Sequence, residues 1–406
     1  MANDLKKPRI AMVIPLPPEM TGIAEYVAVL LPALAQHFDI DLYTSADLGA
    51  LESLKARHGI HHFSELEANR DRYDEVVYQF GNSPFHSHMV DLLDRVPGIV
   101  VLHDFYLSSM LAYMDLHQDR PGLFKQELVR SHGDDAQIEL VLKGPWETTK
   151  HFPASRRIIE RAKGVLVHSE HAGEMRDAFY PSLDQRNWMK VPMPQPAVRS
   201  LSAEERQAVR TRLGFSAADF LAISLGFLAD TKLNDVLLDA LSDERLSGDR
   251  SLHVVFVGEN DGGEYGRLLK QKIGGLPNRE RIAITGFVSD DAYGDYLLAA
   301  DCAVQLRTRS RGETSKAVHD CMSHGLPTVV NDYGSFHELP AEALIKIAPE
   351  PTPEELAEVL FSLRNNPLRR AVLGMSAKHH MAAVHLAHHV AAEYARAIRH
   401  FAKKEN

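Results

Sequence analysis

Cysteine is nearly absent from this sequence of 406 residues, which contains only Cys302 and Cys321 and no pair with CxxC spacing. Two cysteines cannot build the disulfide framework of a small secreted protein. Low cysteine usage is also typical of proteins in the reducing cytosol. We therefore expect a cytoplasmic protein without a disulfide framework.

Long apolar runs are missing as well. No stretch approaches the roughly 18 apolar residues that a membrane-spanning helix needs. The opening segment MANDLKKPRIAMVIP has neither the long apolar core nor the small-residue cleavage site of a signal peptide. We expect no spanning segment, so that any contact with the inner face of a membrane would be peripheral.

Basic runs and metal-binding motifs are scarce too. The formal net charge is −10, which predicts no nucleic-acid partner. His385 and His389 have the spacing of a chelating pair, but no Glu follows His385 as HExxH requires. The adjacent Asp pairs at 134–135 and 290–291 are expected at solvated helix starts or loops. We expect neither a metal ion nor a cofactor.

What the sequence does contain is a repeated alternation of strand-like and helical segments. Apolar runs such as RIAMVIP, EVVYQFG and GIVVLHD in the first half, and FLAISLGFL, LHVVFVG and CAVQL in the second, are separated by segments with helical periodicity. This alternation is typical of parallel sheets covered by helices on both faces. A chain of this length favours two such domains of about 200 residues each.

We accordingly predict an α/β fold of two parallel-sheet domains, at 1–195 and 196–378, joined by a linker near residues 192–202 that begins with three closely spaced prolines. A terminal helix is expected from His379 to Lys403. At about 1.5 Å per residue it would be about 37 Å long, more than one domain needs. We therefore expect the segment 379–406 to return to the N-terminal domain.

Ligands of such sheets lie beyond the carboxyl ends of the strands. Gly22, Asn82 and His103 follow strands of the first half, and Lys232 and Gly258 follow strands of the second. Each also has an ordinary explanation as a turn residue, an Asx-turn or a satisfied histidine. Their joint occurrence at the expected crevice nevertheless favours a binding site.

The stretch from Cys302 to Pro340 has the strongest local pattern. An apolar strand breaks at Gly312, and a helix is predicted from Thr314 to Ser323. Thr314 and Ser315 in its first turn would bind an anion, because unpaired N–H groups and the helix dipole favour negative charge there. The alternative is that both residues only cap the helix.

The motifs together resemble the family-4 retaining glycosyltransferases, whose GT-B fold consists of two facing Rossmann-like domains. The resemblance covers essentially the whole chain, and its motifs are listed here in chain order: PPEMTGIAEY, GNSPFH, VVLHDF, GVLVHSEHAG, GFLADTK, VFVGEN, ITGFVSDDAYGDYLLAADCAVQLR and RGETSKAVHDCMSHGLPTVVNDYGSFHEL. It implies that the C-terminal domain binds a nucleotide sugar and that the N-terminal domain binds the acceptor.

The resemblance also assigns roles to residues. Lys232 matches the lysine that contacts the donor diphosphate, and Asp320 matches the second acidic residue of a paired motif, which contacts the ribose. His103 matches the histidine near the transferred sugar, and Gly22 matches the glycine loop that faces the diphosphate.

Two positions depart from the family pattern. Phe227 stands where the family has an arginine, so that a second cation must come from elsewhere; Arg311 is our candidate, and Arg307 and Arg309 stay open. Gly312 stands at the first acidic position, with Glu313 one residue later as the candidate sugar contact.

The resemblance thus implies a metal-independent retaining glycosyltransferase that moves a hexose, with mannose one candidate, from a GDP- or UDP-linked sugar. The acceptor would be a glycan or a lipid-linked molecule in cell-surface polysaccharide synthesis. Two alternatives stay open: a sugar-nucleotide epimerase or hydrolase of the same fold, and a catalytically silent subunit that binds nucleotide sugars.

Overall fold

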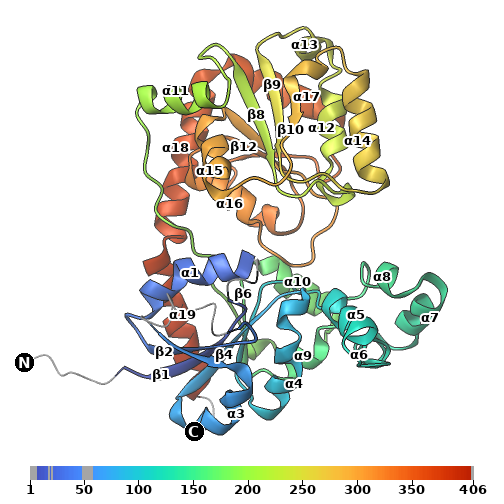
Figure 1. The fold of residues 1–406 in the computed structure, drawn as a ribbon, viewed down its shortest axis with the longest axis vertical. Helices are drawn as coiled ribbons and strands as arrows, with labels where there is room; N and C mark the ends of the chain where they lie inside the picture. The colour runs from blue at the N-terminus through green and yellow to red at the C-terminus, as the bar shows by residue number, and fades with distance from the viewer. Residues whose placement is uncertain (1–6, 17–18, 20–21, 48–57, 404–406) are drawn as a thin grey trace, which may run out of the picture. The chain divides into compact units, whose positions relative to one another are not determined.

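A computed structural model describes residues 7–16, 19, 22–47 and 58–403 of the chain. Part of the PPEMTGIAEY motif, at 17–18 and 20–21, lies outside the described residues. The chain divides into two compact units (Figure 1). Unit 1 comprises Met1–Pro194, Arg311–Thr314 and His385–Asn406, and unit 2 comprises Gln195–Ser310 and Ser315–Val384.

Unit 1 is built on a seven-stranded parallel sheet with the order β3-β2-β1-β4-β5-β6-β7. Its strands are β1 (Arg9–Val13), β2 (Asp39–Thr44), β3 (Gly59–His62), β4 (Glu75–Phe80), β5 (Ile99–Leu102), β6 (Gly164–Val167) and β7 (Trp188–Lys190). The chain adds strands first on one side of β1 and then on the other. The order therefore reverses between β1 and β4, the point at which such sheets bind ligands.

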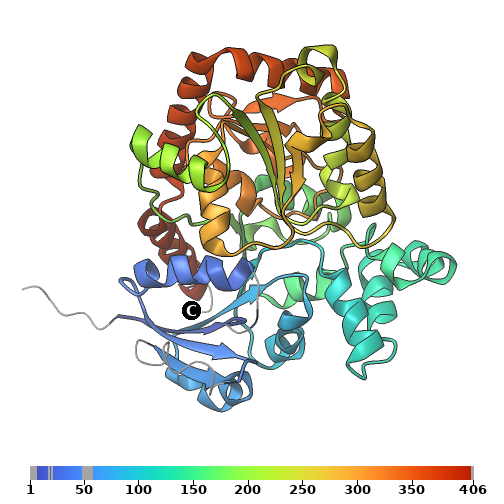
Figure 2. The same ribbon diagram turned by 45° about the horizontal axis from the view of Figure 1, so that its top comes forward.

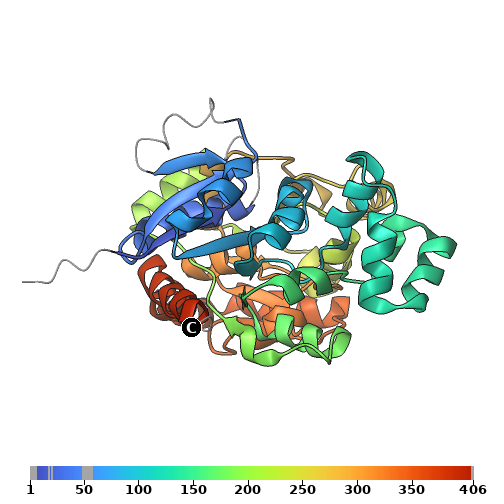
Figure 3. The ribbon, with the colours of Figure 1, turned by 90° about the horizontal axis from the view of Figure 1, so that it is seen from below.

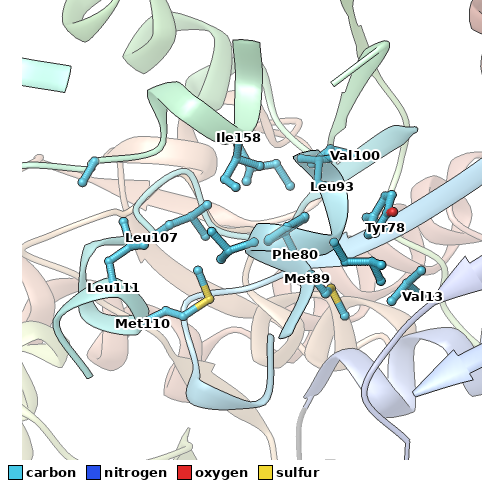
Figure 4. Packing of buried hydrophobic residues seen from close by; sticks show 14 of the residues in the cluster. Val13, Tyr78, Phe80, Met89, Leu93, Val100, Leu107, Met110, Leu111 and Ile158 are labelled. Carbon is cyan, nitrogen blue, oxygen red and sulfur yellow. The ribbon is translucent and has the colours of Figure 1, made fainter. Parts of the chain in front are cut away.

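Helices cover both faces of this sheet because strand side chains alternate between its faces. Ile10 and Met12 join a core with α1 and α19, whereas Ala11 and Val13 join a core with α4 and α5 (Figure 4). The helices of unit 1 are α1 (Gly22–Leu34), α3 (Leu66–Asn69), α4 (His88–Arg95), α5 (Ser108–His117), α6 (Leu123–His132), α7 (Asp134–Lys143), α8 (Pro145–Thr148), α9 (Arg156–Arg161), α10 (Glu170–Phe179) and α19 (Ala387–Ala402).

The long connection between β5 and β6 forms a separate helical cluster. Helices α5 to α8 lie beside the sheet of unit 1 (Figure 2). Seen from below, this cluster is on the side of unit 1 opposite to α19 (Figure 3).

Unit 2 has a six-stranded parallel sheet with the order β10-β9-β8-β11-β12-β13. Its strands are β8 (Phe220–Leu225), β9 (Leu252–Val257), β10 (Ile282–Ile284), β11 (Cys302–Val304), β12 (Thr328–Asn331) and β13 (Ile345–Ile347). Its helices are α11 (Ala203–Arg212), α12 (Asn234–Ala240), α13 (Glu244–Ser247), α14 (Glu264–Gly275), α15 (Asp290–Ala299), α16 (Lys316–Ser323), α17 (Pro353–Asn365) and α18 (Pro367–Val384). Here the order reverses between β8 and β11.

The single terminal helix expected from His379 to Lys403 is wrong, because two helices occupy this region. Helix α18 ends at Val384 in unit 2, and α19 begins at Ala387 in unit 1. The backbone of Leu386 is extended, with φ −62° and ψ 139°, and the ring of His385 is hydrogen-bonded through Nδ1 to the carbonyl of Met193 at 2.8 Å. This tertiary contact holds the break between the helices.

The predicted α/β architecture, with two parallel sheets and a C-terminal helix that returns to the first of them, is confirmed. Helix α19 packs beside α1 and contributes Val390, Tyr394, Ile398 and Phe401 to the core of unit 1. Within the described ranges, no helix has both the length and the apolar character needed to cross a membrane.

The contact between α19 and β6 can be tested by a double-variant cycle. Phe401→Ala should lower the free energy of unfolding of unit 1 by about 3–5 kcal/mol, because it leaves a cavity. Gly164→Ala should lower it by about 1–3 kcal/mol, because the added methyl group would lie 2.4 Å from the ring of Phe401. The double variant should lose less free energy of unfolding than the sum of the two single losses, since removal of the Phe401 ring relieves the clash.

Denaturant unfolding followed by tryptophan fluorescence measures this cycle, because both tryptophans of the chain, Trp146 and Trp188, lie in unit 1. Arg396→Ala, on the exposed side of α19, is the control and should change stability little. Strictly additive effects of Gly164→Ala and Phe401→Ala would contradict the contact.

Candidate functional site

The loops that follow β8 and β11 meet where the strand order of unit 2 reverses. Lys232 ends a short 3-10 helix, Asp230–Lys232, after β8, and Arg307 follows β11. The backbone N–H of Thr308 donates to the carbonyl oxygen of Thr231 at 3.0 Å. This bond joins the two loops directly and brings Lys232 and Arg307 together.

Lys232 is half-buried, and its ammonium makes no hydrogen bond or ion pair within the part of the chain that the structure describes. Burial and, to a smaller extent, the positive charge of Arg307 lower the pKa of Lys232 from 10.5 to about 7. Removing an ammonium from water and placing it beside a second cation disfavours its charged form. An anion bound here would reverse both effects.

Arg307 is held by the end of the neighbouring strand β12. Its backbone N–H donates to Oδ1 of Asn331 at 2.8 Å, and Nδ2 of Asn331 donates to the carbonyl oxygen of Arg307 at 2.7 Å. Its guanidinium carbon lies 5.4 Å from the centre of the Phe336 ring. The loop is therefore fixed at its backbone and partly at its side chain, so that Arg307 is positioned before a ligand binds.

The helix expected to begin at Thr314 begins at Lys316, and Thr314 therefore lies before it. Ser315 is the N-cap residue, and its hydroxyl accepts a hydrogen bond from the N–H of Val318 at 3.4 Å. Both Thr314 and Ser315 are cap-forming residue types, and only one of them can occupy the cap position. The predicted anion contact of Ser315 stays a prediction, as does that of Thr314.

Asp320 lies on α16, with only 7% of its surface exposed. Its Oδ2 accepts hydrogen bonds from the hydroxyl of Tyr293 at 2.9 Å and from Nζ of Lys316 at 2.8 Å. Two donors thus orient the carboxylate. A ribose hydroxyl would have to bind the other oxygen, Oδ1, and the predicted ribose contact stays a prediction.

Gly258, at the end of β9, has a structural reason to be glycine. An added Cβ atom would lie 2.1 Å from the carbonyl oxygen of Gly226, the residue that follows β8. Phe227 comes next in the chain and is 51% exposed. The close approach of the two loops accounts for Gly258 without a ligand, so that its predicted contact with substrate stays a prediction.

The segment Arg311–Thr314 belongs to unit 1, although it lies between β11 and α16 in the chain. The carbonyl oxygen of Arg311 accepts hydrogen bonds from the N–H groups of Phe105, at 2.8 Å, and Tyr106, at 3.2 Å. A carboxylate oxygen of Glu313 accepts the N–H of Arg311. Arg311 and Glu313 are thus grouped with unit 1, whereas Lys232 and Arg307 are grouped with unit 2.

Gly312 must be glycine for two reasons. Its φ is +82°, which disfavours residues with a Cβ atom. An added Cβ would also lie 2.5 Å from Cβ of Phe105. These constraints explain why this position carries no acidic side chain.

In unit 1, His103 follows β5 and lies between three other side chains. Its Nε2 is 2.8 Å from Oε1 of Gln79, and its ring lies 4.6 Å from that of Tyr26 and 4.9 Å from that of His168. Burial, followed by the charges of His168 and His86, lowers the pKa of His103 well below 6.5. His103 is therefore neutral at physiological pH and can both donate and accept a hydrogen bond.

The other predicted residues of unit 1 have local roles. The backbone N–H of Asn82 donates to Oδ2 of Asp104 at 3.0 Å, and its Oδ1 accepts the N–H of Met110 at 3.1 Å. Gly22 is the exposed first residue of α1, with no atom within 4 Å of an added Cβ. Substrate contacts of Asn82 and Gly22 stay predictions.

Sequence reasoning did not identify Gln79 and His168. His168 could have been found, because it follows β6 directly, as His103 follows β5. Gln79 is difficult to recognise from the sequence, since it is a single polar residue inside an apolar strand. Among the described residues, no group of three or more His, Cys, Asp or Glu side chains is arranged to hold a metal ion.

Comparisons with known proteins give a family model that matches part of the chain and solved structures with the same fold. Residues 205–380 match the family model described as "Glycosyl transferases group 1". A mannosylfructose-phosphate synthase from Agrobacterium fabrum (strain C58 / ATCC 33970) is 34% identical over 141 residues, which are 34% of this chain and 30% of the relative. The match therefore spans less than a third of that relative's length.

Solved structures match over nearly the whole chain. Anabaena HepE in complex with UDP has a TM-score of 0.69 and 15% identity, and the match covers 97% of this chain and 100% of that one. WaaG, a glycosyltransferase involved in lipopolysaccharide biosynthesis, has a TM-score of 0.62 and 14% identity, with 96% and 99% covered. At these identities the likeness shows the fold alone.

The role of Gly312 can be tested by Gly312→Ala. This change should lower the free energy of unfolding of unit 1 by about 1–3 kcal/mol, because a methyl group at positive φ is strained and collides with Phe105. Tryptophan fluorescence during denaturant unfolding measures the effect. Gly173→Ala in α10, where the nearest atom is 3.7 Å away, is the control and should be neutral or stabilising. Equal effects of the two changes would show that the packing of Gly312 is misassigned.

Proposed function

We propose that the chain, whose residues 205–380 match the family model of group 1 glycosyl transferases, is a retaining glycosyltransferase. It transfers a hexose from a GDP- or UDP-linked sugar to a glycan or lipid-linked acceptor, without a metal ion, in cell-surface polysaccharide synthesis. Such an enzyme would work in the cytoplasm, and a lipid-linked acceptor would bring it to the inner face of the membrane.

The observation that carries this proposal is the half-buried, unpartnered ammonium of Lys232 beside Arg307, among the residues that the structure describes. Two adjacent cations are unfavourable unless an anion lies between them. They lie where the strand order reverses, at the carboxyl edge that binds ligands in such sheets. A diphosphate has the charge and the number of acceptor oxygens to bind both side chains.

The same pair of cations would promote the reaction. When the bond between the sugar and the diphosphate breaks, negative charge builds up on the leaving phosphate oxygens. Lys232 and Arg307 would stabilise this charge more strongly in the transition state than in the bound donor, which lowers the barrier. The backbone N–H groups at the start of α16 would add to this stabilisation.

The resemblance and the geometry support the remaining roles. Asp320, oriented by Tyr293 and Lys316, would accept hydrogen bonds from the ribose. His103, held neutral by burial, would contact the transferred sugar. Arg307 is our choice for the cation that replaces the arginine missing at Phe227, because its loop is bonded directly to the loop of Lys232.

The matched proteins support the choice of substrates. HepE has been crystallised with UDP-glucose as well as with UDP, which favours a nucleotide sugar as donor. WaaG acts in lipopolysaccharide biosynthesis, which favours a cell-surface glycan. The name of the Agrobacterium relative, a mannosylfructose-phosphate synthase, makes mannose donors the first to test beside the glucose donors that HepE suggests.

Incubation with labelled GDP- and UDP-sugars tests the proposal. A glycosyltransferase transfers label only when acceptor is present, and NMR of the product would show the retained anomeric configuration. Epimerisation or hydrolysis without acceptor, or tight donor binding without any turnover across an acceptor panel, would contradict the proposal.

Charge-removing variants then test the residues. Lys232→Met and Arg307→Met should each lower turnover by about a hundredfold, because each removes a charge that stabilises the leaving group. Lys270→Met, at an exposed position of α14, is the matched control and should retain turnover. Wild-type turnover in Arg307→Met together with a large loss in Arg311→Met would transfer the role to Arg311.

The pH dependence of binding provides a separate prediction. The pKa of Lys232 is about 7 in the free protein, and a bound diphosphate raises it. Above pH 7, binding must therefore take up a proton, and the affinity for UDP or GDP should fall by up to about tenfold per pH unit. Calorimetry between pH 7 and 9 measures this slope. In Lys232→Arg, which stays charged, the slope should disappear; an equal slope in both proteins would contradict the assignment.

A further inference from the structure

Three polar side chains lie at the carboxyl ends of three neighbouring strands in unit 1. Gln79 is the penultimate residue of β4, His103 follows β5, and His168 follows β6. The strands β4, β5 and β6 are adjacent in the sheet. Their ends therefore place these side chains at the edge where ligands bind.

Gln79 is completely buried and faces two histidines. Its backbone carbonyl oxygen is 2.8 Å from Nδ1 of His86, and its side-chain oxygen, Oε1, is 2.8 Å from Nε2 of His103. An amide oxygen can only accept a hydrogen bond, so that Nε2 of His103 must carry the proton. In a neutral imidazole the other nitrogen, Nδ1, then keeps its lone pair.

The neighbouring rings fix the orientation of His103. The ring of Tyr26 stands nearly perpendicular to it, at 85°, and the ring of His168 lies 4.9 Å away. Nδ1 of His168 is bonded to the carbonyl of Val191 at 3.0 Å, so that His168 is also held as one neutral tautomer. Burial is the main cause that lowers the pKa of His168 to about 4.

An amide suits this position better than a carboxylate. A buried glutamate would also accept the Nε2 proton, but its charge would stabilise the imidazolium, in which both nitrogens donate. Glutamine holds the same proton without adding charge. His103 therefore keeps one nitrogen able to accept a hydrogen bond, and Nδ1 makes no hydrogen bond within the described part of unit 1.

We propose that Gln79 is the positioning residue of His103: it fixes the tautomer with the proton on Nε2, so that Nδ1 accepts a hydrogen bond from a hydroxyl group of the sugar substrate. The contact with sugar rests on the proposed function, whereas the tautomer does not.

NMR of the full chain labelled with ¹⁵N-histidine tests the tautomer directly. Two-bond proton–nitrogen correlations distinguish the two neutral forms, and the loss of one signal set in His103→Ala assigns the residue. The wild type should show protonated Nε2 and unprotonated Nδ1. A proton on Nδ1 in the wild type would overturn the proposal, and this measurement needs no variant at Gln79 to fold.

Variants at Gln79 test whether this residue fixes the tautomer of His103. Gln79→Met, of similar size, should shift His103 to a mixture of tautomers, and Gln79→Glu should give an imidazolium with both nitrogens protonated at pH 7. The control is Gln305→Met, which removes another buried glutamine, in unit 2, and should leave the His103 signals unchanged. An unchanged tautomer in Gln79→Met would overturn the proposal.

Turnover measurements test whether the tautomer of His103 matters for the reaction. Once a donor and an acceptor are known, Gln79→Met should lower kcat by about tenfold or more, as loss of a partner that orients a reactive histidine does, and leave KM for the donor nearly unchanged. Wild-type kcat in a Gln79→Met protein with altered tautomer would show that Nδ1 does not serve the substrate. If no donor is turned over by the wild type, the proposed function fails, and the tautomer result stands on its own.

Discussion

The half-buried ammonium of Lys232 beside Arg307 is the interaction on which this account of the molecule depends. Lys232 and Arg307 lie far apart in the sequence. The reversal of strand order between β8 and β11 makes their loops neighbours, and one backbone hydrogen bond from Thr308 to Thr231 joins them. The fold thus places Lys232 beside Arg307 before any ligand binds, and the proposed diphosphate would compensate the repulsion between the two charges.

The two departures from the family pattern have different physical meanings. At Phe227 an arginine is missing, and the loop after β11 places Arg307 beside the same lysine. At Gly312 an acidic residue is missing because the backbone adopts a positive φ and packs against Phe105. Under the proposed function, the first departure moves a charge to another element, whereas the second reflects a local packing constraint on the loop.

Much of the fold could be predicted from the sequence, because alternating apolar strands and amphipathic helices specify parallel sheets, and the residues after each strand define the ligand edge. Lys232 and His103 were predicted as site residues in this way. Features decided by tertiary contacts could not be found. Nothing local distinguishes Ser315 from Thr314 as the helix cap, or Arg307 from Arg309 and Arg311. The break at His385 has no glycine or proline, and it depends on a bond to Met193.

A crystal structure of the chain with a nucleoside diphosphate tests the central claim most directly. We expect phosphate oxygens within hydrogen-bonding distance of both Nζ of Lys232 and the guanidinium of Arg307, beside the first turn of α16. A diphosphate bound elsewhere, with Lys232 and Arg307 unchanged and without contact to it, would contradict the account.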